Sequence, residues 1–264
     1  MILWQKLCHK LRAPNYVLDR TARLSKMTNK IVYKRALLKL SGEALGGPAG
    51  QGYDTEVINK IATDIAILSK LGVELGIVVG GGNFFRGLAS GLPGCDRVGA
   101  DHIGMLATVM NALAIGHAIR GHGVNVSVLS SIPIDSLVEG FSAKKARTRI
   151  SQGEVVVFGG GTGNPLFTTD SAAALRAVEC DADILIKATR VNGVYSADPE
   201  KYPEATRFQA LSFSAIIEKR LAVMDTTAFA MCEESKMPIR VIDLAREDSI
   251  KKVVFGLDEG TLIQ

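Results

Sequence analysis

Three short, β-rich apolar segments of the chain each run directly into a cluster of glycines. The clusters are KLSGEALGG at residues 39–47, VVGGGNFFRG at 78–87 and FGGGTGNPLFTTD at 158–170. Glycine weakens a strand because it loses much conformational freedom on folding and has no side chain to pack, so its repeated use indicates backbone held close to something. In open α/β sheets, ligands bind at the carboxyl ends of the strands. We therefore expect an α/β protein in which all three glycine loops face one crevice and form a phosphate site.

Between these loops the chain alternates short apolar runs with longer segments of helical periodicity. That alternation is typical of βαβ units and a mainly parallel sheet. Strands are expected at 35–40, 73–79, 124–129, 154–158, 184–187 and 239–242, and helices at 54–71, 98–120, 143–151, 170–179, 212–220 and 225–234, before a closing helix. Asn192-Gly193 predicts a type I′ hairpin turn between KATRV and VYSAD. Because no linker or repeat interrupts residues 31–264, we expect them to form a single domain.

Length and charge limit the classes of protein this chain can belong to. A chain of 264 residues, 47% of them hydrophobic, can bury a sizeable core. It has no run of the roughly 18 consecutive apolar residues that a membrane span needs, so no membrane partner is expected. Residues 1–30 carry a formal charge of +6 and the remainder carries −2. The body of the chain therefore gives no electrostatic reason to expect nucleic-acid binding.

The basic segment at residues 1–30 differs from the rest of the chain. It is poor in acidic residues and contains arginine, as organelle transit peptides do, but Ser25 is its single serine and it has no apolar run typical of a secretory signal. We interpret it as a dispensable extension or a start-site error, with Met27 as the functional first residue.

Cysteines and histidines are scattered without ligand spacing. The four cysteines are Cys8, Cys95, Cys180 and Cys232, and the four histidines are His9, His102, His117 and His122. No zinc site, other metal site or disulfide framework is expected from them, and a reducing, cytoplasmic setting fits. His117 and His122 fall on a helix and in its exit turn, where we expect structural roles.

Three charged residues stand out beside the glycine loops, and each allows an ordinary structural interpretation. Lys39 lies near the end of an apolar strand, where lysine is unusual unless it is paired or functional. Arg86 is explained equally well as a solvated loop charge, and Asp170 as the N-cap of the following helix. The P-loop pattern, the dinucleotide-binding pattern and the protein-kinase signatures are all absent from the sequence, which disfavours those three classes.

Six segments, in order from about Tyr33 to the C-terminus, resemble the bacterial uridylate kinases of the amino acid kinase superfamily. They are KLSGEAL, GGGNFFRG, DHIGMLATVMNALA, GTGNPLFTTDSAA, KATRVNGVYSADP and VMDTTAF. The resemblance implies a three-layer α/β/α sandwich around a mainly parallel sheet, unrelated to the P-loop nucleoside monophosphate kinases. It also implies transfer of the ATP γ-phosphate to UMP, giving UDP and ADP, in de novo pyrimidine nucleotide synthesis. A cytoplasmic homohexamer, Mg²⁺ bound with ATP, a GTP activator and a UTP inhibitor belong to the same expectation.

The resemblance further implies roles for individual residues. The catalytic group is Lys39, Lys187, Asp170 and Asp225, with the two carboxylates orienting the lysines and the magnesium–nucleotide complex. The ATP contacts are Lys39, Leu40, Ser41, Gly42, Gly82, Arg86, Thr189, Tyr195 and Asp198. The UMP contacts are Gly81, Asp101, Thr162, Gly163, Asn164, Pro165, Leu166, Phe167, Thr168 and Thr169. The allosteric loop is Gly47, Pro48, Ala49, Gly50, Gln51 and Gly52.

The chemistry of this reaction agrees with the lack of a catalytic histidine. A phosphate monoester with a second pKa of about 6 is largely ionised at neutral pH and needs no strong general base. The reaction does need relief of charge repulsion, which lysines, glycine N–H groups and Mg²⁺ would supply. Asp101 keeps an alternative interpretation as a helix cap rather than a contact to the ribose of UMP.

Some positions depart from the pattern of the resembled family, and the sequence disfavours two other functions. Leu166 replaces a common aromatic residue, Arg190 and Asn192 stand where K-V-D-G is frequent, and Gly160 stands where alanine is common. A kinase that phosphorylates a carboxylate or carbamate, such as acetylglutamate kinase, is disfavoured by T-G-N-P-x-F-T-T. A catalytically silent nucleotide sensor is disfavoured because Lys39, Asp170 and Asp225 are all present.

Overall fold

The computed structural model describes residues 30–87, 92–199, 201–219, 221 and 223–264. Within these residues, nine strands form one sheet in the order β4-β3-β5-β2-β1-β6-β8-β9-β7. Neighbouring strands are parallel except for the antiparallel pair β8 and β9. The strands are β1 Arg35–Leu40, β2 Glu74–Val79, β3 Val126–Ser130, β4 Glu139–Gly140, β5 Val155–Gly159, β6 Ile184–Thr189, β7 Ala210–Leu211, β8 Ile239–Asp243 and β9 Thr261–Ile263.

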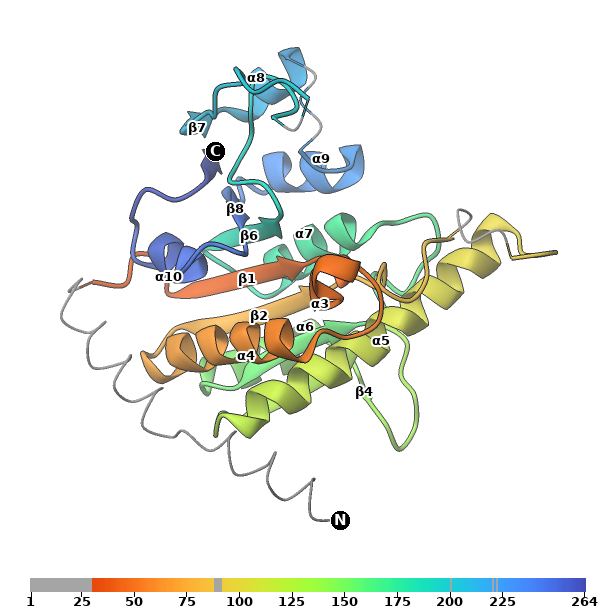
Figure 1. Ribbon diagram of the computed structural model, residues 1–264. Helices are drawn as coiled ribbons and strands as arrows, with labels where there is room; N and C mark the ends of the chain where they lie inside the picture. Colours follow the sequence, from red (N-terminus) through yellow and green to blue (C-terminus); the bar gives the residue numbers. More distant parts are fainter. Residues whose placement is uncertain (1–29, 88–91, 200, 220, 222) are drawn as a thin grey trace, which may run out of the picture.

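Helices cover both faces of this sheet, which confirms the predicted three-layer α/β/α arrangement (Figure 1). They are α3 Gly42–Leu45, the 3₁₀ turn η1 Gly47–Ala49, α4 Thr55–Lys70, α5 Arg97–Gly121, α6 Ala143–Ser151, α7 Thr169–Glu179, α8 Phe213–Glu218, α9 Thr226–Glu234 and α10 Ser249–Val254. One core cluster lies between the sheet and α4, α5 and α10. The other lies between the sheet and α6, α7, α8 and α9.

Polar side chains cap the amino ends of the helices that border the candidate site. Asp54 accepts hydrogen bonds from two backbone N–H groups at the start of α4, Thr168 accepts from two at the start of α7, and Asp96 accepts from one at the start of α5. At the other end of α4, Gly72 takes a left-handed φ of 85° and stops the helix. The sequence predicts the cap at Asp54 and the stop at Gly72, but not the caps at Asp96 and Thr168.

The strand β1 places its side chains alternately on the two faces of the sheet. Leu38 and Leu40 belong to the core beneath α4 and α5, whereas Leu37 belongs to the core beneath α7. Because side chains two residues apart share a face, Lys39 points to the α7 side with Leu37. This register brings Lys39 to the amino end of α7.

The predicted hairpin around Asn192-Gly193 is wrong. Gly193 has a positive φ of 114° but Asn192 does not, whereas a type I′ turn needs both. The segment KATRV cannot pair with VYSAD because β6 is already bonded on its two edges to β1 and β8. Tyr195 instead bridges Arg207. The short elements β4, β7, β9, α3 and η1 were not expected from the sequence.

Among the described residues, α5 alone has the length and apolar composition of a membrane-spanning helix, and half of its most apolar window is buried in the fold. It packs along β3 and β5. Burial of this kind is what a core helix of an α/β protein shows.

Candidate active site

The first two glycine loops touch each other at the carboxyl edge of the sheet. A Cβ atom on Gly42 would lie 2.5 Å from Gly82 N and 2.7 Å from Gly80 O, so only glycine allows the two backbones to approach this closely. The third loop is next to them, because a Cβ on Gly80 would lie 3.4 Å from the hydroxyl of Thr169. The predicted convergence of the three loops is confirmed.

A carboxylate between two lysines lies beside these loops. Lys39 and Lys187 are register partners on β1 and β6, so both side chains leave the sheet on the same face. Asp170, in the first turn of α7, has Oδ1 at 2.9 Å from Lys39 Nζ and Oδ2 at 2.6 Å from Lys187 Nζ. The side chains of Lys39, Lys187 and Asp170 are 12, 13 and 14% exposed, so the cluster is held mostly away from solvent.

Burial and charge act against each other in this cluster. Burial by itself would raise the pKa of Asp170, but the charges and hydrogen bonds of Lys39 and Lys187 hold that pKa below its ordinary value. Burial lowers the pKa of Lys187, and the Asp170 carboxylate opposes this shift. With both lysines protonated and Asp170 ionised, the cluster carries one net positive charge. That charge suits a phosphate group.

The sequence-based interpretation of Asp170 as a helix cap is wrong. The cap of α7 is Thr168, whose hydroxyl accepts from the N–H groups of Asp170 and Ser171. The carboxylate of Asp170 is therefore available to the two lysines. Asp225 caps α9 and also accepts hydrogen bonds from the hydroxyls of Thr168 and Ser171, which joins α9 to the start of α7.

A cavity of about 310 Å³ opens between the second and third glycine loops and α5. Its lining residues are Gly81, Gly82, Phe85, Arg86, Gly87, Ala100, Asp101, Gly104, Met105, Thr108, Gly161, Phe167, Thr168 and Thr169. Five of the predicted UMP contacts are among them, and so are two predicted ATP contacts, Gly82 and Arg86. Residues 162–166, also predicted to contact UMP, belong to the same loop but do not line the cavity.

The family model for the amino acid kinase family matches residues 34–243. The chain belongs to the amino acid kinase family. Two solved structures that are similar to it are a UMP kinase from Bacillus anthracis, with 34% identity, and a UMP kinase from Ureaplasma parvum, with 36% identity. Each alignment covers 88% of this chain and 96% or 98% of the other, with TM-scores of 0.84 and 0.82. A uridylate kinase from Archaeoglobus fulgidus is similar over 87% of this chain and 99% of its own, with 30% identity and a TM-score of 0.67.

In this amino acid kinase, helix α5 holds the third glycine loop at two points. Thr108 Oγ1 accepts from Gly160 N at 2.8 Å, and Asp101 Oδ2 accepts from Leu166 N at 2.8 Å. Asp101 Oδ2 also accepts a hydrogen bond from Arg97 Nε at 2.9 Å. The alternative interpretation of Asp101 as a helix cap is wrong, because Asp96 caps α5.

A buried arginine supports the same loop from the opposite side. The guanidinium of Arg176 on α7 is stacked 3.7 Å from the ring centre of Phe141 and forms an ion pair with Glu179. Its Nη2 donates to Ser131 Oγ at 2.8 Å, and that hydroxyl donates to Gly161 O at 2.8 Å. This relay reaches the cavity wall through residues that the sequence analysis did not single out.

Two buried asparagines connect the second glycine loop to α5. Asn111 Nδ2 donates to Asn83 Oδ1 at 2.7 Å and to Gly80 O at 2.7 Å, and Asn83 Nδ2 returns a bond to Asn111 Oδ1 at 3.2 Å. Asn83 also donates to Gly52 O at 2.8 Å. The predicted allosteric loop 47–52 is therefore bonded directly to the second glycine loop.

The other predicted ATP contacts lie around the ends of β1 and β6. Ser41 caps α3, and Thr189 Oγ1 donates to Val191 O at 2.7 Å. Tyr195 and Asp198 lie in the segment between β6 and β7, where Asp198 Oδ2 is 3.6 Å from Lys201 Nζ. Of the predicted ATP group, the structure brings Lys39 into the lysine cluster and Gly82 and Arg86 to the cavity.

The donor set suits a magnesium ion that arrives with a nucleotide. Within the described part of the chain, no three His, Cys, Asp or Glu side chains gather as a metal site. Asp170 and Asp225 are carboxylates of the kind that Mg²⁺ uses, but Asp170 faces two lysines and Asp225 binds two hydroxyls and a backbone N–H. Phosphate oxygens would therefore have to supply most of the ligands.

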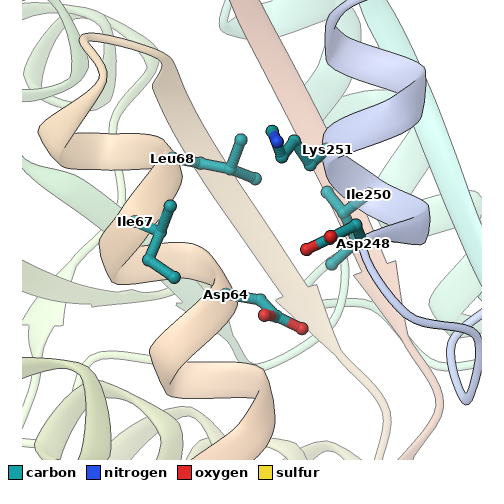
Figure 2. Close-up of a pocket in the computed structure, with 6 residues that line it drawn as sticks. All are labelled: Asp64, Ile67, Leu68, Asp248, Ile250 and Lys251. Atoms are coloured by element: carbon teal, nitrogen blue, oxygen red, sulfur yellow. The ribbon is translucent and has the colours of Figure 1, made fainter. Parts of the chain in front are cut away.

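A second hollow lies far from the glycine loops, between α4 and α10 (Figure 2). Its volume is about 10 Å³, and its walls are Asp64, Ile67, Leu68, Asp248, Ile250 and Lys251. A space of this size holds about one water molecule. It has no room for a nucleotide, so the candidate active site is the cavity beside the lysine cluster.

Proposed function

We propose that this amino acid kinase transfers the γ-phosphate of ATP to UMP, producing UDP and ADP. The observation that carries the proposal is the Lys39–Asp170–Lys187 cluster at the amino end of α7, next to a cavity of about 310 Å³ that Phe167, Thr168 and Thr169 help to line. Two similar solved structures are bacterial UMP kinases, and their alignments with this chain cover 88% of it at 34 and 36% identity.

In the proposed reaction, an oxygen of the UMP phosphate attacks the γ-phosphorus of ATP. A new phosphorus–oxygen bond forms to UMP while the bond to the β–γ bridging oxygen breaks, and ADP leaves with that electron pair. No proton has to be removed from an ionised phosphate, so the site needs no histidine near the lysines.

The main work left to the protein is to bring negative charges together. Two unit charges about 4 Å apart repel by about 4 kcal/mol at an effective dielectric of 20. Lys39 and Lys187 are fixed by Asp170 before any substrate binds, so they offset this repulsion without reorganising during the reaction. Arg86 on the cavity wall adds a third cation.

Magnesium bound with ATP would neutralise the β- and γ-phosphate oxygens. Asp170 and Asp225 are the carboxylates at the site that would face such a complex. Asp170 keeps the lysines directed at the phosphates, and Asp225 keeps Thr168 in place at the end of the acceptor loop.

We extend the proposal to a cytoplasmic homohexamer in de novo pyrimidine nucleotide synthesis, with GTP as activator and UTP as inhibitor. An assembly is supported by exposed apolar side chains on α5, where Val98, Leu106 and Met110 are 40, 47 and 50% exposed. The loop 47–52, proposed as the allosteric segment, is bonded to the second glycine loop through Asn83.

The test is ADP release by the purified protein with ATP and Mg²⁺, offering UMP, CMP, dTMP, AMP and acetylglutamate in parallel. We expect turnover with UMP alone. In the matched variant Lys39→Ala, turnover should fall by about two orders of magnitude or more because one preorganised cation is lost. Lys60→Ala, which removes an exposed lysine on α4, should leave it unchanged.

Turnover with acetylglutamate instead of UMP would overturn the proposed acceptor. If a folded Lys39→Ala protein turned over at the rate of the wild-type protein, Lys39 would have no part in the mechanism. Absence of turnover with every acceptor, in a protein that still binds ATP, would favour a nucleotide sensor.

A further inference from the structure

A glycine in the middle of α5 lies on the wall of the acceptor cavity. Ala100, Gly104 and Thr108 follow one another at intervals of four residues, so they share one face of the helix, and all three line the cavity. Glycine inside a helix is less favourable than alanine because it loses more backbone freedom. Gly104 therefore needs a reason to be there.

Neither the backbone nor the packing of this chain requires glycine at position 104. Its φ angle is not in the left-handed region, so an L-residue can adopt the same conformation. A Cβ built on Gly104 meets no atom within 4 Å. Gly116 of the same helix is different, because its Cβ would lie 2.8 Å from a methyl group of Val128.

The backbone of Gly104 also touches the second glycine loop, but through its carbonyl group. A Cβ on Gly81 would lie 2.7 Å from Gly104 O, so Gly81 is the residue that this contact restricts. A side chain at 104 would leave the carbonyl oxygen in place. The contact with Gly81 therefore does not require glycine at position 104, and the open space beside Gly104 belongs to the cavity.

We propose that Gly104 is a size-determining residue of the acceptor site, kept without a side chain so that a nucleoside monophosphate fits between α5 and the two glycine loops. This inference rests on the proposed function, since it takes the 310 Å³ cavity as the acceptor site. A larger residue at 104 would occupy volume that the acceptor needs and would leave the lysine cluster untouched.

The test compares Gly104→Ala and Gly104→Leu with Gly121→Ala. Gly121 is the matched control because it ends the same helix, is exposed, also has nothing within 4 Å of its Cβ position, and does not line the cavity. For each protein we would measure Tm, the KM for UMP, the KM for ATP and the Kd for UMP by calorimetry.

For Gly104→Ala we expect the Tm to stay the same or rise by about 2 °C, because alanine favours the helix. The KM and Kd for UMP should rise by about tenfold or more, the usual effect of one carbon atom too many in a binding pocket. Gly104→Leu should raise them further. The KM for ATP should stay within about twofold in both variants, and Gly121→Ala should change neither substrate constant.

An unchanged Kd for UMP in Gly104→Leu would overturn the inference, and so would equal increases in the KM for ATP and UMP together with a lower Tm. These outcomes are separate from failure of the proposed function, which would appear in the wild-type protein as absence of turnover with UMP.

Discussion

At the scale of single residues, the charge balance of the site depends on Asp170. This carboxylate contacts both Lys39 and Lys187, and all three side chains are mostly buried. Removing one partner of a buried ionic group leaves charge without compensation, which typically costs about 3 to 5 kcal/mol. The same residue thus ties the stability of the fold to the arrangement of the two lysines that we propose to be catalytic.

The prediction at this scale concerns the pH dependence of stability in Asp170→Asn. The pKa of Asp170 in the folded protein lies below its ordinary value of 3.8, so its contribution to the free energy of unfolding is complete above that value and is lost as the pH falls through the folded pKa. At pH 7 we expect the variant to unfold more easily in urea by about 3 to 5 kcal/mol.

As the pH falls through the pKa of folded Asp170, which lies below 3.8, protonated Asp170 and asparagine become equivalent in charge, so the difference between the two proteins should shrink. Urea unfolding curves at several acidic pH values measure this difference in the free energy of unfolding. A difference that stayed constant in acid, or equal stability at pH 7, would show that the ion pairs contribute nothing.

At the scale of elements, the sequence predicts most helices and strands because their local signals are strong. β1 and α6 coincide with their expected ranges, and the ends of α4 follow from Asp54 and Gly72. The hairpin was predicted wrongly because a local turn signal says nothing about which edges of β6 are already paired.

The same reasoning explains which site residues the sequence could indicate. Lys39 and Asp170 lie at a strand end and a helix start beside glycine loops, whereas Lys187 was indicated only by the resemblance to a known family. The support from Arg176 to Gly161 passes through Ser131, which is 45 residues from Arg176 and 30 from Gly161 in the chain. No periodicity or spacing in one sequence shows such a contact, because it depends on how β3 pairs with β5 and on how α7 packs on β1 and β2.

The element-scale prediction tests this support through Ser131→Ala. The variant loses the hydrogen bond to Gly161 O, and a typical net loss of about 0.5 to 1.5 kcal/mol corresponds to roughly a two- to tenfold weaker acceptor site. We expect the KM for UMP to rise by that factor with little change in the KM for ATP.

Ser127→Ala is the matched control, because Ser127 lies at the other end of β3 and bonds to Glu154 instead. Steady-state kinetics of the two variants give the KM for UMP and the KM for ATP. If Ser127→Ala and Ser131→Ala raised the KM for UMP equally, the effect would come from strand stability and not from the relay.

At the scale of the whole molecule, the fold described here begins beside α10. Val32 N and Tyr33 N both donate to Val254 O, at 3.0 and 3.2 Å, and the chain then enters the central strand β1. The residues of the candidate site all lie between Lys39 and Asp225. The basic segment at residues 1–30, interpreted from the sequence as a dispensable extension, lies outside the described residues except for Lys30.

We therefore predict that a chain of residues 27–264 keeps the turnover and the Tm of the full chain, within about 2 °C, the shift that corresponds to less than about 1 kcal/mol for a domain of this size. A shorter chain, residues 35–264, is the informative comparison: it loses the bonds of Val32 and Tyr33 to Val254, so its Tm should fall by several degrees. Thermal unfolding and ADP release of the three proteins measure both effects. Loss of turnover already in residues 27–264 would make the basic extension part of the working enzyme, because every contact described for the sheet and the cavity is still present in that chain.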